Sequence, residues 1–170
     1  MNSTEYTAKA LRELPDKLKK KSNELLAYLR RLRNKNPKKL DYIFAEIHQA
    51  VFEKYDCLAC GNCCRTLGPR FLDRDIERIS AFMTMHPKTF RLQYLAVDED
   101  NEYVLQKLPC RFIMDDNSCF IYDKRPKACE DFPHTDSRNM RGKLMLTHKN
   151  LGVCPAVLEI VEIIRERIPL

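Results

Sequence analysis

Eight cysteines in 170 residues constrain this chain more than any other feature, and four of them fall within one eight-residue segment. Residues 57–64 read CLACGNCC. Two residues between cysteines let successive sulfurs turn toward a common centre, and Gly61 permits the tight backbone that such a loop needs. The segment therefore predicts a metal site.

The compartment of the protein decides whether these thiols are reduced. The first residues lack the basic region and apolar core of a cleaved secretory signal, which predicts a cytoplasmic protein. Thiols stay reduced there, so a dense set of cysteines favours metal binding over disulfides. The most apolar stretch, residues 157–168, carries five charged residues and is too short for a membrane span, so we expect no contact with a membrane.

The cysteines fall into two candidate ligand sets. Three cysteines spaced C-x2-C-x2-C are similar to a bacterial ferredoxin loop, in which a remote cysteine followed by proline completes the cluster. The first set is accordingly Cys57, Cys60, Cys63 and Cys154. Neighbouring side chains in an extended or turning backbone project apart, so Cys63 and Cys64 are expected to serve different centres. The second set is Cys64, Cys110, Cys119 and Cys129. Two clusters, two zinc ions, or one centre with spare thiols all fit eight sulfurs.

The rest of the sequence predicts an α+β fold. Residues 1–56 have apolar residues at helical spacing and are expected to form a basic helical hairpin. Pro15 suits the first turn of its first helix, and Asn36 with Pro37 suits the start of the second. Residues 57–170 are expected to form a small metal-stabilised cysteine-cluster domain of short helices and strands.

Within the second domain the expected elements are short. Apolar spacing predicts helices over residues 72–83 and 90–95, and a closing helix that begins at Cys154-Pro155. A turn is expected at residues 115–117. The expected strands are residues 103–105, 111–114, 119–122 and 144–147.

Charge is concentrated at the N-terminal end. Residues 1–56 contain 13 basic and 8 acidic residues and so carry five of the six net positive charges. This hairpin is a candidate surface for an unknown protein or redox partner. Acidic residues dilute its charge and aromatic residues are sparse, which disfavours nucleic acid as the partner. The four glycines form neither a dinucleotide-binding nor a P-loop pattern.

The cysteine pattern resembles that of the YkgJ-type cysteine-cluster proteins, a family described as a zinc- or iron-chelating domain. Its hallmark CxxCxxCC is followed here by Cys110, by CFIYDKRP at residues 119–126 and by CEDFP at residues 129–133. The resemblance covers residues 57–155 and implies a metal-chelating domain. More distantly, the chain is similar to the flagellin lysine N-methylases, which implies an iron–sulfur centre tied to methyl transfer from S-adenosylmethionine.

Arg125 is the candidate residue for contact with the cofactor. A cluster held by four thiolates is negative, so a nearby guanidinium stabilises it and raises its reduction potential. Arg125 is expected to pair with the sulfurs or with a carboxylate such as Asp131, and Pro126 is expected to start a short helix toward Cys129. His134 is an alternative ligand near that cysteine.

The leading hypothesis is a cytoplasmic iron–sulfur protein with one or two clusters, of the 4Fe–4S type, for electron transfer, cluster handling or a cluster-dependent modification. One alternative is a structural zinc module that presents the basic hairpin to a partner. Another is a methylase-like enzyme that uses S-adenosylmethionine. No residue has an assigned catalytic role. The expected ligands are Cys57, Cys60, Cys63, Cys64, Cys110, Cys119, Cys129 and Cys154.

Overall fold

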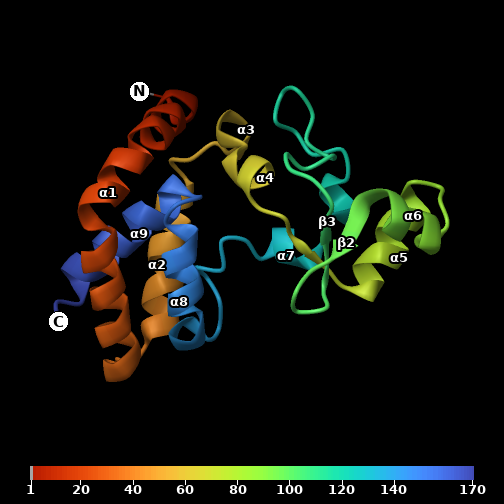
Figure 1. Cartoon of the computed structure of the whole chain (residues 1–170). Helices are drawn as coiled ribbons and strands as arrows, with labels where there is room; N and C mark the ends of the chain where they lie inside the picture. Colours follow the sequence, from red (N-terminus) through yellow and green to blue (C-terminus); the bar gives the residue numbers. More distant parts are fainter. Residues whose placement is uncertain (1) are drawn as a thin grey trace. The chain divides into compact units, whose positions relative to one another are not determined.

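The computed structural model describes residues 2–170 and confirms an α+β fold with two compact units (Figure 1). Unit 1 comprises Met1–Cys60 and Pro133–Leu170, and unit 2 comprises Gly61–Phe132. These units do not coincide with a division at residue 56, because the last two helices pack against the first two. The N-terminal hairpin therefore shares its core with the end of the chain.

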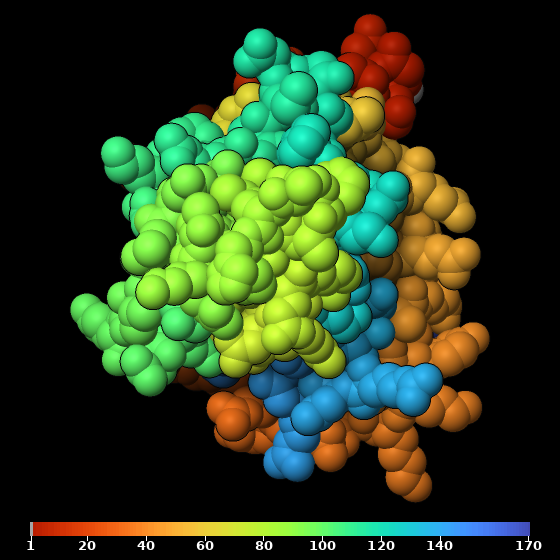
Figure 2. Space-filling view, turned by 90° about the vertical axis from the view of Figure 1, so that its right-hand side faces the viewer, coloured from red at the N-terminus to blue at the C-terminus, as the bar shows by residue number. Residues whose placement is uncertain are grey.

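Unit 1 consists of helices. They are α1 (Ser3–Lys35), α2 (Leu40–Phe52), α3 (Cys57–Cys60), α8 (Met140–Asn150) and α9 (Pro155–Arg167). The buried leucines of α1, among them Leu25, Leu29 and Leu32, pack against α8 and α9 in one apolar core. On the surface, residues near the start of α8 lie beside those of α2 (Figure 2). Across residues 2–170, no helix combines the length and apolarity that crossing a bilayer requires.

Both expected helix starts in the hairpin were wrong. α1 begins at Ser3 with a capping box between Asn2 and Glu5, and it runs through Pro15, which is exposed. Water can therefore satisfy the carbonyl that Pro15 leaves without a helical partner. Asn36 ends α1 in the left-handed conformation (φ 42°) and does not start α2, which begins at Leu40. Asparagine tolerates the left-handed region, so it suits either end of a helix.

Unit 2 is built on a small antiparallel sheet in the order β1-β3-β2. The strands are β1 (Arg70–Phe71), β2 (Leu95–Val97) and β3 (Tyr103–Leu105), and β3 confirms the expected strand. The helices are α4 (Asn62–Thr66), α5 (Asp73–Phe82), α6 (Pro87–Tyr94), η1 (Tyr122–Lys124) and α7 (Lys127–Glu130). Their core contains Phe71, Ile76, Ile79, Phe90 and Phe112.

Three of the four expected strands differ from the structure. Residues 144–147 lie inside α8, which Asn139 caps by accepting a hydrogen bond from Gly142 N–H. A short run such as LMLT, with three apolar residues and a threonine, suits a buried helix as well as a strand, so its composition could not distinguish the two. Residues 111–114 and 119–122 form no named strands and share a single bridge, between Ile113 and Cys119. The turn between them is present, with Asn117 at φ 66°.

Candidate metal centre

All eight cysteines are free thiols, and each unit holds its own group. Unit 1 contains Cys57, Cys60 and Cys154. Unit 2 contains Cys63, Cys64, Cys110, Cys119 and Cys129. The chain segments that carry each group are far apart in sequence, so the tertiary fold brings them together.

The backbone of unit 2 links three of its cysteine-bearing segments. Cys64 lies in α4, and its carbonyl oxygen accepts a hydrogen bond of 2.8 Å from the N–H of Cys110. Cys119 follows on the other side of the turn and pairs with Ile113. Cys110 and Cys119 both pack against the apolar core of the unit. Backbone pairing and packing thus fix these two cysteines relative to Cys64.

Cys129 completes this group from α7. Burial, together with the charges of Cys64, Cys110 and Cys119, raises the pKa of the Cys129 thiol to about 12. Burial also raises the pKa values of Cys110 and Cys119, and the charge of Cys64 adds to both shifts. The sulfurs of these four cysteines lie close enough for the charge of one thiolate to disfavour ionisation of another. A bound metal cation would supply the positive charge that stabilises the thiolates.

Backbone amides point toward several sulfurs. The N–H groups of Phe112 and Ile113 donate to Cys110 and oppose the increase in its pKa that burial causes. Ile121 N–H acts in the same way on Cys119. In each case the donor lies two or three residues after the cysteine. Such turns stabilise sulfur in its anionic form, the form that binds metal.

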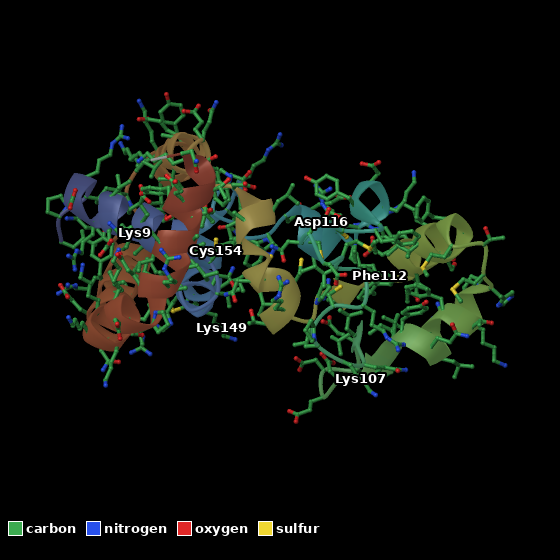
Figure 3. All side chains as sticks on the ribbon, turned by 90° about the horizontal axis from the view of Figure 1, so that it is seen from above. Lys9, Lys107, Phe112, Asp116, Lys149 and Cys154 are labelled. Carbon is green, nitrogen blue, oxygen red and sulfur yellow. The ribbon has the colours of Figure 1, made fainter. Side chains whose placement is uncertain are left out.

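Unit 1 holds the second group around the start of α9. Cys154 is the N-cap residue of this helix and Pro155 its first residue, as the sequence predicted (Figure 3). Burial raises the pKa of Cys154 to about 12, the amides of Val157 and Ala156 lower it, and the thiols of Cys60 and Cys57 raise it. These two lie at the ends of α3, which packs on α1. Three of the four cysteines in the first expected set are therefore neighbours.

The vicinal cysteines do not project apart as expected. Both lie in α4, where the Sγ atoms of Cys63 and Cys64 are 4.0 Å apart. A helical turn rotates neighbouring side chains by about 100° only, whereas an extended chain points them to opposite faces. A hydrogen bond from Cys63 lowers the pKa of Cys64 to about 7; burial opposes this shift and Arg65 reinforces it. The assignment of Cys63 to the first set stays a prediction.

Gly61 shapes the loop that leads into α4. It has φ 56° and precedes the helix as its N-cap residue. A Cβ atom there would meet the guanidinium of Arg65 and lie 2.8 Å from Asn117 Oδ1. Both the left-handed backbone and this close approach require glycine. The sequence prediction for Gly61 is confirmed.

Arg125 lies close enough to two of the thiols to influence them. Its charge lowers the pKa values of Cys119 and Cys129 against the dominant effect of burial. The guanidinium stacks 4.0 Å over the ring of Tyr122, and Nη1 donates to Tyr122 O. The expected pairing with Asp131 is not formed, because Lys127 holds that carboxylate at 2.6 Å. Pro126 does precede a short helix, α7, that contains Cys129.

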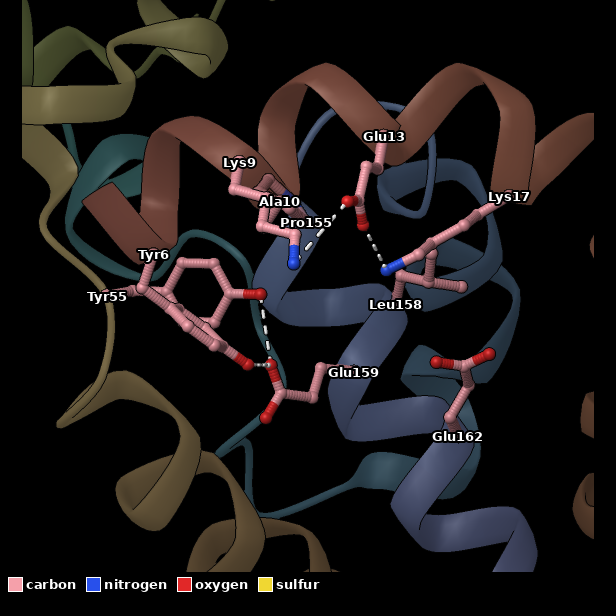
Figure 4. Close-up of a pocket in the computed structure, with 10 residues that line it drawn as sticks. All are labelled: Tyr6, Lys9, Ala10, Glu13, Lys17, Tyr55, Pro155, Leu158, Glu159 and Glu162. Atoms are coloured by element: carbon pink, nitrogen blue, oxygen red, sulfur yellow. Dashed lines mark hydrogen bonds and ion pairs between the residues drawn. The ribbon is translucent and has the colours of Figure 1, made fainter. Parts of the chain in front are cut away.

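Two aspects of this site were not foreseen. Arg65 adds positive charge beside Cys64. Its position directly after Cys64 in the sequence could have predicted this effect. Near Cys154, the hydroxyls of Tyr6 and Tyr55 both donate to Glu159 Oε2, at 2.7 and 3.0 Å (Figure 4). No sequence pattern joins these three residues.

His134, the alternative ligand, lies in unit 1, whereas Cys129 lies in unit 2.

The sulfurs are grouped but do not surround a single point. Within residues 2–170, no three side chains of His, Cys, Asp or Glu are already arranged to hold one metal ion. A tetrahedral zinc site holds its sulfurs about 3.8 Å apart. The donor chemistry of Cys64, Cys110, Cys119 and Cys129 suits a thiophilic metal.

Comparison with known proteins identifies the same segment. A family model described as "CxxCxxCC: Putative zinc- or iron-chelating domain" matches residues 56–155. No curated protein and no solved structure matches the chain. The matched segment contains all eight cysteines, from Cys57 to Cys154.

Proposed function

The chain belongs to the CxxCxxCC family of zinc- or iron-chelating domains, and on this premise we propose that it is an iron–sulfur protein with one centre in each unit. Unit 2 would hold its cluster through Cys64, Cys110, Cys119 and Cys129. Unit 1 would contribute Cys57, Cys60 and Cys154. The grouping of four thiols in unit 2 carries the proposal, because four thiolates are the usual ligand set of a cluster.

Iron is favoured over zinc by the spacing of the cysteines. Three cysteines at C-x2-C-x2-C in residues 57–63 and the remote Cys154-Pro155 pair are similar to the ligand pattern of a bacterial ferredoxin. When bound, such a cluster accepts and donates single electrons, so electron transfer or cluster handling is the proposed role. Because such thiols must stay reduced until they bind metal, a cytoplasmic location is part of the proposal.

The residues around the cluster would tune it. Burial of Cys129 and Cys154 limits access of water, and the amides near Cys110, Cys119 and Cys154 would donate to the bound sulfurs. Arg125 would place positive charge beside the cluster of unit 2. Each amide and the guanidinium favour the more negative, reduced state and so raise the reduction potential.

A structural zinc site is the second candidate, on one specific observation. The Sγ atoms of Cys63 and Cys64 are 4.0 Å apart, close to the spacing of about 3.8 Å between two sulfurs on one zinc ion. Such a site would stabilise the fold without redox activity. It requires two further ligands beside this pair, since a structural zinc ion takes four.

Purification without oxygen distinguishes the two functions. The iron–sulfur proposal predicts a brown protein that contains iron and acid-labile sulfide in similar amounts, and whose visible absorption bleaches on reduction. Iron, zinc and sulfide would be measured per chain on the same sample. A colourless protein with stoichiometric zinc and no sulfide would reject iron and leave the zinc function.

A further inference from the structure

The end of unit 1 at which α8 begins carries a group of basic side chains. The C-terminal end of α1, the start of α2 and the start of α8 meet there (Figure 1). Arg141 Nε donates to Arg33 O at 3.1 Å, and Met140 N–H donates to Asp41 Oδ1 at 2.9 Å. These bonds join two segments about 100 residues apart in the chain. The basic cluster, as we call it, consists of Arg33, Lys35, Lys38, Lys39, Arg138 and Arg141.

The cluster carries a net positive charge. In the part of the chain that the structure describes, residues 2–170, none of its six side chains forms an ion pair, and all six are exposed. Two acidic residues of the hairpin are paired elsewhere, Glu24 with Arg165 and Glu46 with Arg167. Two carboxylates remain beside the cluster: Asp41, whose Oδ1 accepts from Met140 N–H, and Asp136, which acts on His48. Six cations therefore face two carboxylates.

The start of α2 adds to the positive charge of this surface. α2 starts at Leu40 without a side-chain cap, so the N–H groups of its first turn are available to an anion beside Lys38 and Lys39. The partial positive charge of this helix terminus has the same sign as the cluster. The cluster and the uncapped helix start together form a surface for a chain of negative groups.

The exposed apolar surface near the cluster is small. Among the exposed large apolar side chains of residues 2–170, Tyr42 is the one within three residues of a cluster member. A protein partner draws its affinity from a buried apolar centre, which this surface lacks. A phosphate backbone needs charge and amide donors only, and an exposed tyrosine can stack on a base.

We propose that the basic cluster binds the phosphodiester backbone of nucleic acid without reading its sequence. This inference is independent of the metal and differs from the expectation drawn from residues 1–56 alone. That expectation counted neither Arg138 nor Arg141, and it counted Glu24 and Glu46, which the fold pairs with Arg165 and Arg167.

Binding of the full chain to a fluorescent single-stranded RNA of mixed sequence, and to a duplex of the same sequence, tests the proposal. Fluorescence anisotropy would be measured over a salt series. The test variant replaces Lys38, Lys39 and Arg138 with glutamine; their side chains make no hydrogen bond or ion pair in the described structure. The matched control replaces Arg12, Lys19 and Lys20 with glutamine; these three exposed residues lie about 20 to 30 Å from Arg33 along α1.

The test variant should bind either RNA about tenfold or more weakly than the wild type at low salt. The slope of log K against log salt should shrink by about 2 to 3, since each lost phosphate contact contributes about 0.9. The control should stay within about twofold. Equal losses in both variants, no loss in the test variant, or no binding by the wild type would overturn the proposal. Cluster-dependent binding to vesicles of anionic lipid, with none to RNA, would also overturn it. Circular dichroism of both variants checks that the helices are intact.

Discussion

The backbone N–H of Cys110 donates a 2.8 Å hydrogen bond to the carbonyl oxygen of Cys64, although 46 residues separate them. This bond fixes the segment before the 115–117 turn against the four-cysteine segment. The charge of this same Cys64 raises the pKa values of Cys119 and Cys129. One backbone contact therefore positions the thiol group on which the proposed cluster of unit 2 depends.

If each unit holds its own centre, a single cysteine variant should lose the centre of its own unit and keep the other. Cys129→Ser should lose the cluster of unit 2, and Cys154→Ser should lose that of unit 1, each with about half of the iron and sulfide. Serine keeps the size of the side chain and removes the thiolate ligand. Iron and sulfide per chain would be assayed after anaerobic purification. Complete loss of iron in both variants would indicate one shared centre instead.

Replacement of Gly61 should destabilise the cysteine loop. Gly61→Ala introduces a Cβ at φ 56°, against Arg65 and Asn117, and should cost about 1 kcal/mol or more of unfolding free energy. Iron occupancy should fall with it. Gly68→Ala is the matched control, because a Cβ there meets nothing within 4 Å. Urea unfolding of the metal-loaded proteins measures both changes, and equal stability of the two variants would contradict the strain argument.

Arg125 should raise the reduction potential of the unit 2 cluster. Arg125→Gln removes a positive charge that acts on Cys119 and Cys129, so the potential should fall on the order of tens of millivolts. Arg125→Lys keeps the positive charge, so its reduction potential should stay close to that of the wild type. Lys107→Gln removes an exposed charge from the same unit and serves as the control. A dye-mediated redox titration measures the shift. An unchanged potential in Arg125→Gln would exclude this role for the guanidinium.

Glu159 should stabilise unit 1 through three hydrogen bonds. It accepts from Tyr6, Tyr55 and Lys54, and Glu159→Gln should cost about 1 to 2 kcal/mol because an amide cannot replace all three. Glu13→Gln is the control, an exposed carboxylate whose loss should have no measurable effect. The free energies would come from urea unfolding of each variant.

The effect of Glu159 should also depend on pH. Burial raises the pKa of its carboxyl, but the bonds from Tyr6, Lys54 and Tyr55 outweigh burial and leave the pKa below its ordinary value of 4.5. A lowered pKa in the folded state stabilises the protein above the unfolded value, and that stability is lost as pH falls. The difference between wild type and Glu159→Gln should therefore narrow below about pH 4.5. A constant difference would contradict the hydrogen-bonded carboxylate.

Local patterns in the sequence predicted several local features correctly. Helical spacing located the helices of the hairpin, and Cys154-Pro155 marked the start of α9. Gly61 and the CxxCxxCC spacing indicated the metal loop. The errors fell where one residue type suits two structures. Asn36 suits either end of a helix, and residues 144–147 suit a buried helix or a strand.

The sequence by itself indicated a metal-chelating domain and a basic helical hairpin before it. The tertiary structure decided how the sulfurs of the second set are held, because a long-range hydrogen bond joins Cys64 to Cys110, and Cys110 and Cys119 pack on one apolar core. It also joined Arg141 to the carbonyl oxygen of Arg33, 108 residues away. Contacts between distant segments set both arrangements, and spacing along the chain does not specify such contacts.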